Sequence, residues 1–162
     1  MNKTKRLATT AVLVSLALIL SFVESRIPAF LPIPGIKIGL ANIVTLFAIY
    51  KLGTKDAIYI LALRVSLASI LFGTVTSFLY AAAGGALSLT VMLLIKKFTP
   101  LSAVSVSVLG GVAHNIAQVC VASLILSTNV VIYYLPPLLL SGTVAGIAVG
   151  LAGGLLVKKV KI

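Results

Sequence analysis

Residues 7–23 read LATTAVLVSLALILSFV, a run of 17 residues without a charged side chain. Lys3, Lys5 and Arg6 stand directly before it. At about 1.5 Å per residue, a helix of this length is about 25 Å long, close to the ~30 Å hydrocarbon core of a bilayer. A basic start and an apolar run are also found in signal peptides, but a signal peptide is followed by a polar mature chain. Here further apolar runs follow, so we expect a first transmembrane helix.

The composition of the whole chain is that of a membrane protein. Of its 162 residues, 60% are hydrophobic and 9% are charged, and the mean hydropathy is +1.24. Soluble domains carry about a quarter of charged residues, and disordered chains are poor in hydrophobic ones, so both classes are excluded. We expect one transmembrane domain over 1–162, with no attached soluble domain. Cys120 is the only cysteine, which excludes an intrachain disulfide.

Five more apolar segments follow the first. The connection at 24–35 contains Pro28, Pro32 and Pro34, and this density of prolines excludes a helix interior, so we expect an apolar loop there. Short groups of charged, glycine or polar residues separate the later segments. The sequence therefore predicts an all-α membrane protein, a bundle of six transmembrane helices. Their expected bounds are 7–23, 36–50, 57–72, 75–95, 101–127 and 130–157.

The basic residues are distributed unevenly over the connections between these segments. Ten of the thirteen fall on one side of a six-span bundle, whereas only Arg26 and Lys37 fall on the other and Arg64 lies within a span. The ten are Lys3, Lys5, Arg6, Lys51, Lys55, Lys96, Lys97, Lys158, Lys159 and Lys161. The positive-inside rule then predicts that both termini are cytoplasmic. A nucleic-acid-binding protein gathers its basic residues on one face, so we expect no nucleic-acid partner.

Small residues recur at helical spacing in two of the predicted helices. Four glycines in the last helix are each four residues apart, and such a groove lets another backbone approach closely in lipid. They are Gly142, Gly146, Gly150 and Gly154. We favour packing within the bundle over a face for a partner protein. A shorter stripe in the first helix, where another membrane protein could dock, consists of Ala8, Ala11 and Ser15.

Polar side chains within the spans mark a candidate binding site, because ionisable groups in a bilayer are costly and usually functional. At 1.5 Å per residue, Arg64 lies near mid-depth, His114 in the outer half and Asn42 near the outside. We expect one cavity, open to the outside, with Arg64 as its floor and the loop at 28–35 over it. The candidate substrate-binding residues are Lys37, Asn42, Arg64, His114, Asn115 and Gln118.

Two of these assignments have simpler alternatives. Arg64 has no acidic partner within the predicted spans, and it could extend to the cytoplasmic interface and to Asp56, two turns away. His114 and Asn115 could form an interhelical hydrogen bond that holds the bundle together. We favour an anionic or strongly polar ligand, because a buried guanidinium needs carbonyl groups, water or an anion around it.

The sequence lacks the side chains of several catalytic classes. An enzyme that acts on diphosphates through Mg²⁺ needs clustered carboxylates, and the two acids, Glu24 and Asp56, fall on opposite sides of the predicted bundle. One His and one Cys do not make a metal site. There is no phosphate-binding loop for ATP and no acidic relay for protons or sodium. We therefore expect a protein that is not an enzyme, with no catalytic residue, metal or cofactor. If the chain moves a solute inward, a partner would have to supply the energy.

Two stretches of the sequence resemble a known family. LPIPGIKIGLAN at 31–42 and GGVAHNIAQ at 110–118 are similar to motifs of the Gx transporter family, which is often labelled heptaprenyl diphosphate synthase component I. The six-helix plan with a basic start also resembles the substrate-binding S components of energy-coupling factor (ECF) transporters.

The resemblance implies a multi-pass subunit of the prokaryotic cell membrane that captures a small anionic or vitamin-like metabolite from outside. Its implied partners are that metabolite, membrane lipid, an ECF T subunit and two ATPase subunits. S components dock through an Ala-x-x-x-Ala motif in their first helix, and here Ala11 and Ser15 stand at these places. The family label implies an alternative, a non-catalytic membrane subunit associated with polyprenyl diphosphate or quinone synthesis. A purely structural membrane subunit remains a third possibility.

Overall fold

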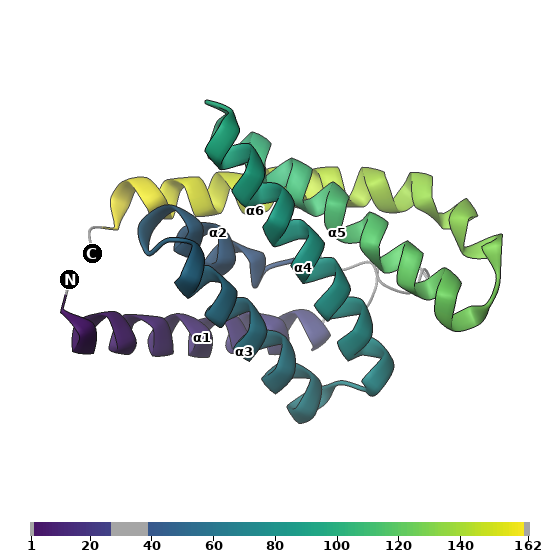
Figure 1. The fold of residues 1–162 in the computed structure, drawn as a ribbon, viewed down its shortest axis with the longest axis horizontal. Coiled ribbons are helices and arrows are strands. Elements are labelled where there is room, and N and C mark those ends of the chain that lie inside the picture. Colours follow the sequence, from purple (N-terminus) through teal and green to yellow (C-terminus); the bar gives the residue numbers. More distant parts are fainter. Residues whose placement is uncertain (1, 27–38, 161–162) are drawn as a thin grey trace.

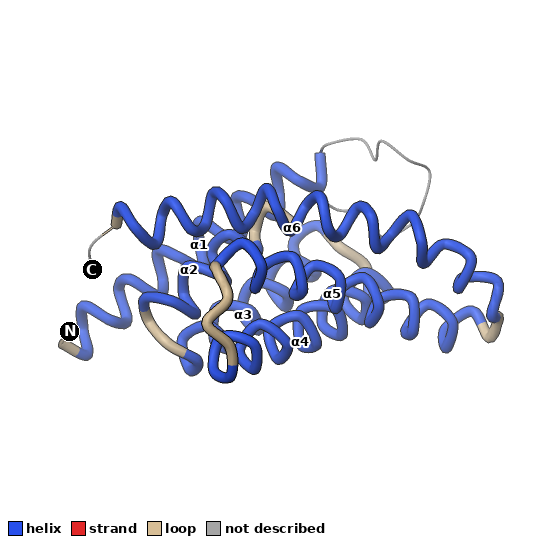
Figure 2. Tube along the Cα trace, turned by 90° about the horizontal axis from the view of Figure 1, so that it is seen from above, coloured by secondary structure: helices blue, strands red, loops and turns tan. Residues whose placement is uncertain are grey.

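The computed structural model describes residues 2–26 and 39–160, and over these residues the chain is all-helical, with no strand (Figure 1). Short loops join most of the helices (Figure 2). The elements are α1 (Lys3–Arg26), α2 (Asn42–Lys51), α3 (Thr54–Phe72), α4 (Val75–Phe98), α5 (Ala103–Leu126), the 3₁₀ helix η1 (Asn129–Tyr134) and α6 (Leu135–Lys159). The prediction of an all-α membrane protein with six α-helices is confirmed to this extent.

Among the described residues, four helical segments are long and apolar enough to cross a membrane: α1, α4, α5 and the stretch from Val130 to Lys159. The six-span count and the orientation of the termini stay predictions. The second helix is shorter than the predicted 36–50. It begins at Asn42 and has 10 residues, which at 1.5 Å each reach about 15 Å, half of a bilayer core. Residues 36–38 lie outside the described part of the chain.

Local chemistry explains where several helices begin. Gly39 has φ +77°, a conformation that side chains rarely adopt, and it turns the chain into α2. At the start of α4, the Thr74 hydroxyl accepts from the Ser77 backbone N–H and the Ser77 hydroxyl accepts from the Thr74 N–H, which is a reciprocal cap. The prolines at 136 and 137 fit the first turn of α6, where no intrahelical N–H partner exists, so the predicted last helix divides into η1 and α6.

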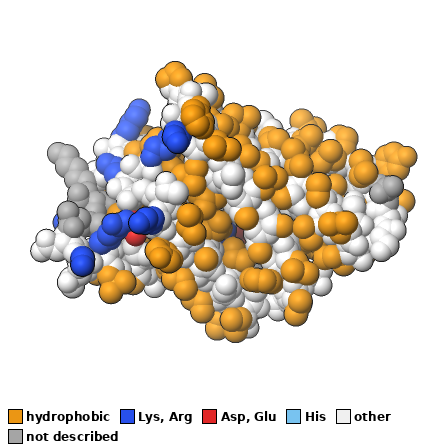
Figure 3. Space-filling view, viewed as in Figure 1, with side chains coloured by type: hydrophobic (Ala, Val, Ile, Leu, Met, Phe, Trp, Pro, Cys, Tyr) orange, Lys and Arg blue, Asp and Glu red, His pale blue; other side chains and the backbone are white. Residues whose placement is uncertain are grey.

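The helices α4, α5 and α6 pack in sequence order, and α1 is attached to the bundle mainly through α3. The start of α1 and the end of α6 lie at the same end of the molecule (Figure 1). Lys and Arg side chains gather at this end, and hydrophobic side chains are spread over the rest of the surface in this view (Figure 3). We call it the basic end.

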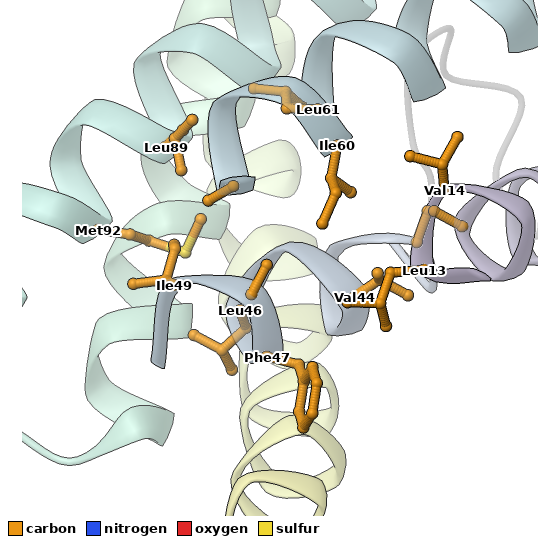
Figure 4. Packing of buried hydrophobic residues seen from close by; sticks show 14 of the residues in the cluster. Leu13, Val14, Val44, Leu46, Phe47, Ile49, Ile60, Leu61, Leu89 and Met92 are labelled. Atoms are coloured by element: carbon orange, nitrogen blue, oxygen red, sulfur yellow. The ribbon is translucent and has the colours of Figure 1, made fainter. Parts of the chain in front are cut away.

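The hydrophobic core is centred on the short helix α2. Its residues 44–49 are all buried, and Leu46 and Ile49 are almost completely enclosed. Figure 4 shows Val44 close to Leu13 of α1, and Ile49 close to Met92 of α4. An apolar helix surrounded on all sides is expected to be hydrophobic around its whole circumference. This explains why α2 is apolar although it is too short to span a bilayer.

The glycine stripe of α6 packs against α5 inside the bundle, as the favoured interpretation predicted. A Cβ atom at Gly146 would lie 2.6 Å from Val108 Cα, and one at Gly150 would lie 2.7 Å from Val104 Cα. The two backbones therefore approach more closely than any side chain at these positions would permit. The contact is looser at Gly154, where a Cβ would lie 3.6 Å from that of Ala103.

Candidate functional site

A cavity of about 260 Å³ with polar side chains in its lining lies between α1, α3, α4, α5 and the turn that precedes α2. It brings together four of the predicted binding residues, Asn42, Arg64, His114 and Gln118. Three different helices supply them. The polar side chains in its lining are Ser21, Glu24, Ser25, Asn42, Arg64, Ser69, Ser77, Tyr80, His114 and Gln118. Lys37 and the loop at 28–35 lie outside the described residues, so their roles stay predictions.

Arg64 faces this cavity. Its Nη2 donates to Asn42 Oδ1 over 3.4 Å, a long hydrogen bond that links α3 to the first residue of α2. Its Nε is buried and has no hydrogen-bond partner within the described residues. A guanidinium with unused donors at the wall of a cavity is suited to bind an anionic group.

The alternative partner for Arg64 is engaged elsewhere. Asp56 accepts two hydrogen bonds from Arg6 Nε, over 2.9 and 3.2 Å, and one from Arg6 Nη2, over 2.6 Å. The Asp56 side chain is 8% exposed, whereas that of Arg6 is 47% exposed. The pair joins the start of α1 to the start of α3 at the basic end. Arg64 therefore does not extend to Asp56.

Glu24 is a cavity residue that our sequence reasoning missed. It lies in the last turn of α1, lines the same cavity as Arg64, and its carboxylate accepts a hydrogen bond from the Gly39 backbone N–H. The sequence predicted that Arg64 has no acidic partner within the spans, and within the described residues Glu24 shares the cavity with Arg64 without forming an ion pair with it. We missed Glu24 because we ended the first helix at Val23. No proline occurs before Pro28, and the helix continues to Arg26, which turns Glu24 towards the bundle.

His114 and Gln118 lie one turn apart on α5 and both line the cavity. The imidazole of His114 packs directly on Gly84 of α4. Gln118 is 7% exposed, and its Oε1 atom has no hydrogen-bond partner in the described part of the chain. Buried polar groups are nearly always hydrogen-bonded, so this oxygen is a second atom that a ligand would satisfy.

Asn115 has a different role from its neighbour His114. Its Nδ2 donates to the Leu138 carbonyl of α6 over 2.5 Å, and Gly142 leaves the space that its amide needs. This is the interhelical hydrogen bond of the alternative interpretation. Asn115 also lines a second cavity of about 40 Å³, which shares Asn42 and His114 with the larger one. A space of this size holds one or two water molecules.

The helix that carries Asn42 is held at its opposite end too. Lys96 Nζ, from α4, donates to the Ile49 carbonyl in the last turn of α2 over 2.5 Å and lies 4.6 Å from the centre of the Tyr50 ring. A cation at a helix C-terminus satisfies carbonyls that have no partner within the helix. This contact helps to keep α2 at the depth where Asn42 meets Arg64.

The predicted docking stripe on α1 is at the surface. Ala8, Ala11 and Ser15 are exposed, while the opposite face of the helix buries Leu13 and Ala17. The Ser15 hydroxyl donates to the Ala11 carbonyl over 3.1 Å, so this position offers no unused donor to a neighbour. The stripe therefore consists of small, accessible residues, and its one hydroxyl group already has a hydrogen-bond partner.

The fold and the site define a class of protein: a helical membrane protein with a cavity between apolar helices that is lined in part by polar side chains. A family profile described as heptaprenyl diphosphate synthase component I matches residues 13–156. The chain belongs to this family, and the resemblance of its sequence to the family is confirmed, whereas the resemblance to ECF S components stays a prediction. Comparison with curated proteins and with solved structures found no match. Among the described residues, no three His, Cys, Asp or Glu side chains come together.

Proposed function

We propose that the chain is the substrate-binding subunit of an ECF-type importer in the cell membrane. In this role it captures a small anionic or vitamin-like metabolite from outside, and a T subunit and two ATPase subunits complete the transporter. The observation that carries the proposal is the cavity in which Arg64, Asn42 and Gln118 meet inside an apolar bundle. The chain itself is not an enzyme in this proposal.

The unsatisfied groups of the cavity support a ligand rather than a purely structural role. Polar groups in a bilayer interior are costly unless they have partners, and Arg64 Nε and Gln118 Oε1 have none among the described residues. The volume of about 260 Å³ lies just below the usual range of small-molecule pockets, which begins near ~300 Å³. A metabolite is therefore a better match than a lipid or a peptide.

The surface of α1 supports the docking role. Its small-residue stripe is exposed, and α1 contacts the rest of the bundle mainly on the side of α3. Small residues allow close helix contacts in membranes, where van der Waals packing drives association. A T subunit helix could therefore pack on Ala8 and Ala11 without displacing any core residue.

Mass spectrometry of the protein purified in mild detergent tests the ligand role directly. We expect a co-purified small molecule in the wild type and its loss in Arg64→Ala. Vesicles should accumulate the molecule only when the T subunit and both ATPases are present and ATP is supplied. Uptake by this chain alone, driven by an ion gradient, contradicts the proposal.

A pull-down with the T subunit tests the docking role. Ala11→Leu should abolish binding of the T subunit and leave ligand binding intact. Arg64→Ala should abolish ligand binding and leave binding of the T subunit intact. Ala62→Leu is the matched control, because Ala62 is an exposed alanine on α3 outside the stripe. If both leucine variants bind the T subunit as well as the wild type does, α1 is not the docking surface.

The family description favours a second candidate function, a membrane subunit associated with polyprenyl diphosphate or quinone synthesis. This alternative predicts that the chain co-purifies with a soluble, aspartate-rich synthase and changes the length or rate of formation of its product. The two proposals differ in their partner. Affinity purification from membranes, with mass spectrometry of the retained proteins, distinguishes a synthase from a T subunit with ATPases.

A further inference from the structure

Among the described residues that line the cavity, a carboxylate and a guanidinium face the same space without touching. Glu24 from α1 and Arg64 from α3 both line it. Within residues 2–26 and 39–160 the one ion pair closer than 4.0 Å joins Arg6 and Asp56, at the basic end. Glu24 and Arg64 are therefore opposite charges that face one space and remain apart.

The turn into α2 keeps the two charges separate. The Glu24 carboxylate accepts from the Gly39 N–H, and the Arg64 guanidinium donates to the Asn42 side chain three residues later. Each charge is thus attached to a different part of the same turn. Opposite charges attract strongly where the dielectric constant is low, so the intervening space is favourable for a group that contacts both.

This arrangement selects among ligand charges. A ligand that is only anionic is attracted by Arg64 but repelled by Glu24. A ligand that is only cationic is attracted by Glu24 but repelled by Arg64. A ligand that carries both charges complements both side chains and leaves no buried charge unpaired. Charge complementarity of this kind discriminates through the cost of the wrong partner as well as through the gain from the right one.

We propose that the cavity binds a zwitterion, with Arg64 at its anionic group, Glu24 at its ammonium group and Gln118 Oε1 accepting from a further donor. This inference rests on the proposed function and narrows its ligand from anionic to zwitterionic. It assigns a binding role to Glu24, the one acidic residue of α1. It also gives a partner to the unsatisfied oxygen of Gln118.

The test uses a series of ω-amino acids from glycine to 6-aminohexanoate as probes. Each is paired with the carboxylic acid and with the amine of equal length. Binding to the full chain in lipid nanodiscs is measured by native mass spectrometry at millimolar concentration. We expect at least one zwitterion to bind about tenfold more tightly than both singly charged analogues, a difference of about 1.4 kcal/mol. The chain length that binds best reports the separation between the two side chains.

Two variants connect this preference to the residues. Glu24→Gln should remove the advantage of the zwitterion over the carboxylic acid, and Arg64→Gln should remove its advantage over the amine. Asp56→Asn is the matched control, because it neutralises the other acid of the chain, which contacts Arg6 outside the cavity. It should leave both advantages unchanged. If Glu24→Gln does not fold, the wild-type comparison among the three probe classes still decides.

The outcomes separate this inference from the proposed function. Three results would overturn the zwitterion proposal. They are equal binding of the carboxylic acid and the zwitterion, binding of neither, and a co-purified metabolite that lacks one of the two charges. Any of these leaves the importer role standing if uptake still depends on the T subunit and ATPases. Absence of such uptake overturns the importer role.

Discussion

The imidazole of His114 lies against the backbone of Gly84, with no room between α5 and α4 for even a methyl group. A Cβ atom at position 84 would come within 2.7 Å of His114 Cε1 and 2.8 Å of Nε2. A real Cβ atom essentially never lies within 3.0 Å of another non-bonded heavy atom, so the ring and the helix cannot both keep their positions once a side chain is added. Gly84 thus determines where the imidazole enters the cavity.

Gly84→Ala is expected to displace His114 and weaken ligand binding by about tenfold or more, alongside a destabilisation of about 1–3 kcal/mol from overpacking. Gly85→Ala is the matched control, because its Cβ would meet only the flexible end of the Leu61 side chain, at 2.9 Å. Thermal unfolding and native mass spectrometry measure the two effects. Normal ligand binding by Gly84→Ala would show that the ring position is unimportant.

The contact between α5 and α6 can be tested with two alanines on one stripe. Gly146→Ala should destabilise the protein by about 1–3 kcal/mol, because its Cβ would lie 2.6 Å from the Val108 backbone, which cannot rotate away. Gly154→Ala should be neutral, since its Cβ would make an ordinary contact at 3.6 Å. Unfolding in increasing denaturing detergent measures both. Equal stability of the two variants would contradict the close backbone approach.

Substitutions at Asn115 and Gln118 should distinguish a role in helix packing from a role in ligand binding. Asn115→Ala removes the hydrogen bond to the Leu138 carbonyl and should cost about 1 kcal/mol of stability, with ligand affinity retained. Gln118→Ala should retain stability and weaken ligand binding, because the Gln118 Oε1 atom has no partner within the described residues. The same unfolding and binding measurements apply. If Asn115→Ala loses the ligand as completely as Gln118→Ala does, Asn115 contacts it.

The pair at the basic end should respond unequally to removal of its two partners. Arg6→Gln leaves the buried Asp56 carboxylate without its cation, whereas Asp56→Asn leaves a half-exposed guanidinium that water can solvate. We therefore expect a larger fall in melting temperature for Arg6→Gln. Arg6→Lys should be intermediate, because an ammonium cannot reproduce the fork of hydrogen bonds. A larger fall for Asp56→Asn would contradict this account.

The ends of the elements were predictable where the signal is local. The helices expected at 75–95 and 101–127 occur at Val75–Phe98 and Ala103–Leu126. The prediction was least accurate at α2, which begins at Asn42 because Gly39 turns the chain there. An apolar run does not reveal whether lipid or other helices surround it, so the sequence could not distinguish a buried half-length helix from a span.

The amino-acid sequence by itself determined the helical class, the membrane environment and the family, because apolar runs, charge groups and short motifs are local properties of a chain. Only the tertiary structure decided which polar residues share a space. Glu24, Arg64 and Gln118 lie on three helices, and the crossing of those helices brings them to one cavity. The same packing places Asp56 beside Arg6, and it places the Asn115 amide where it donates a hydrogen bond to α6. Such pairings depend on the rotation of each helix about its axis, which is set by the close fit of side chains and glycines between neighbouring helices.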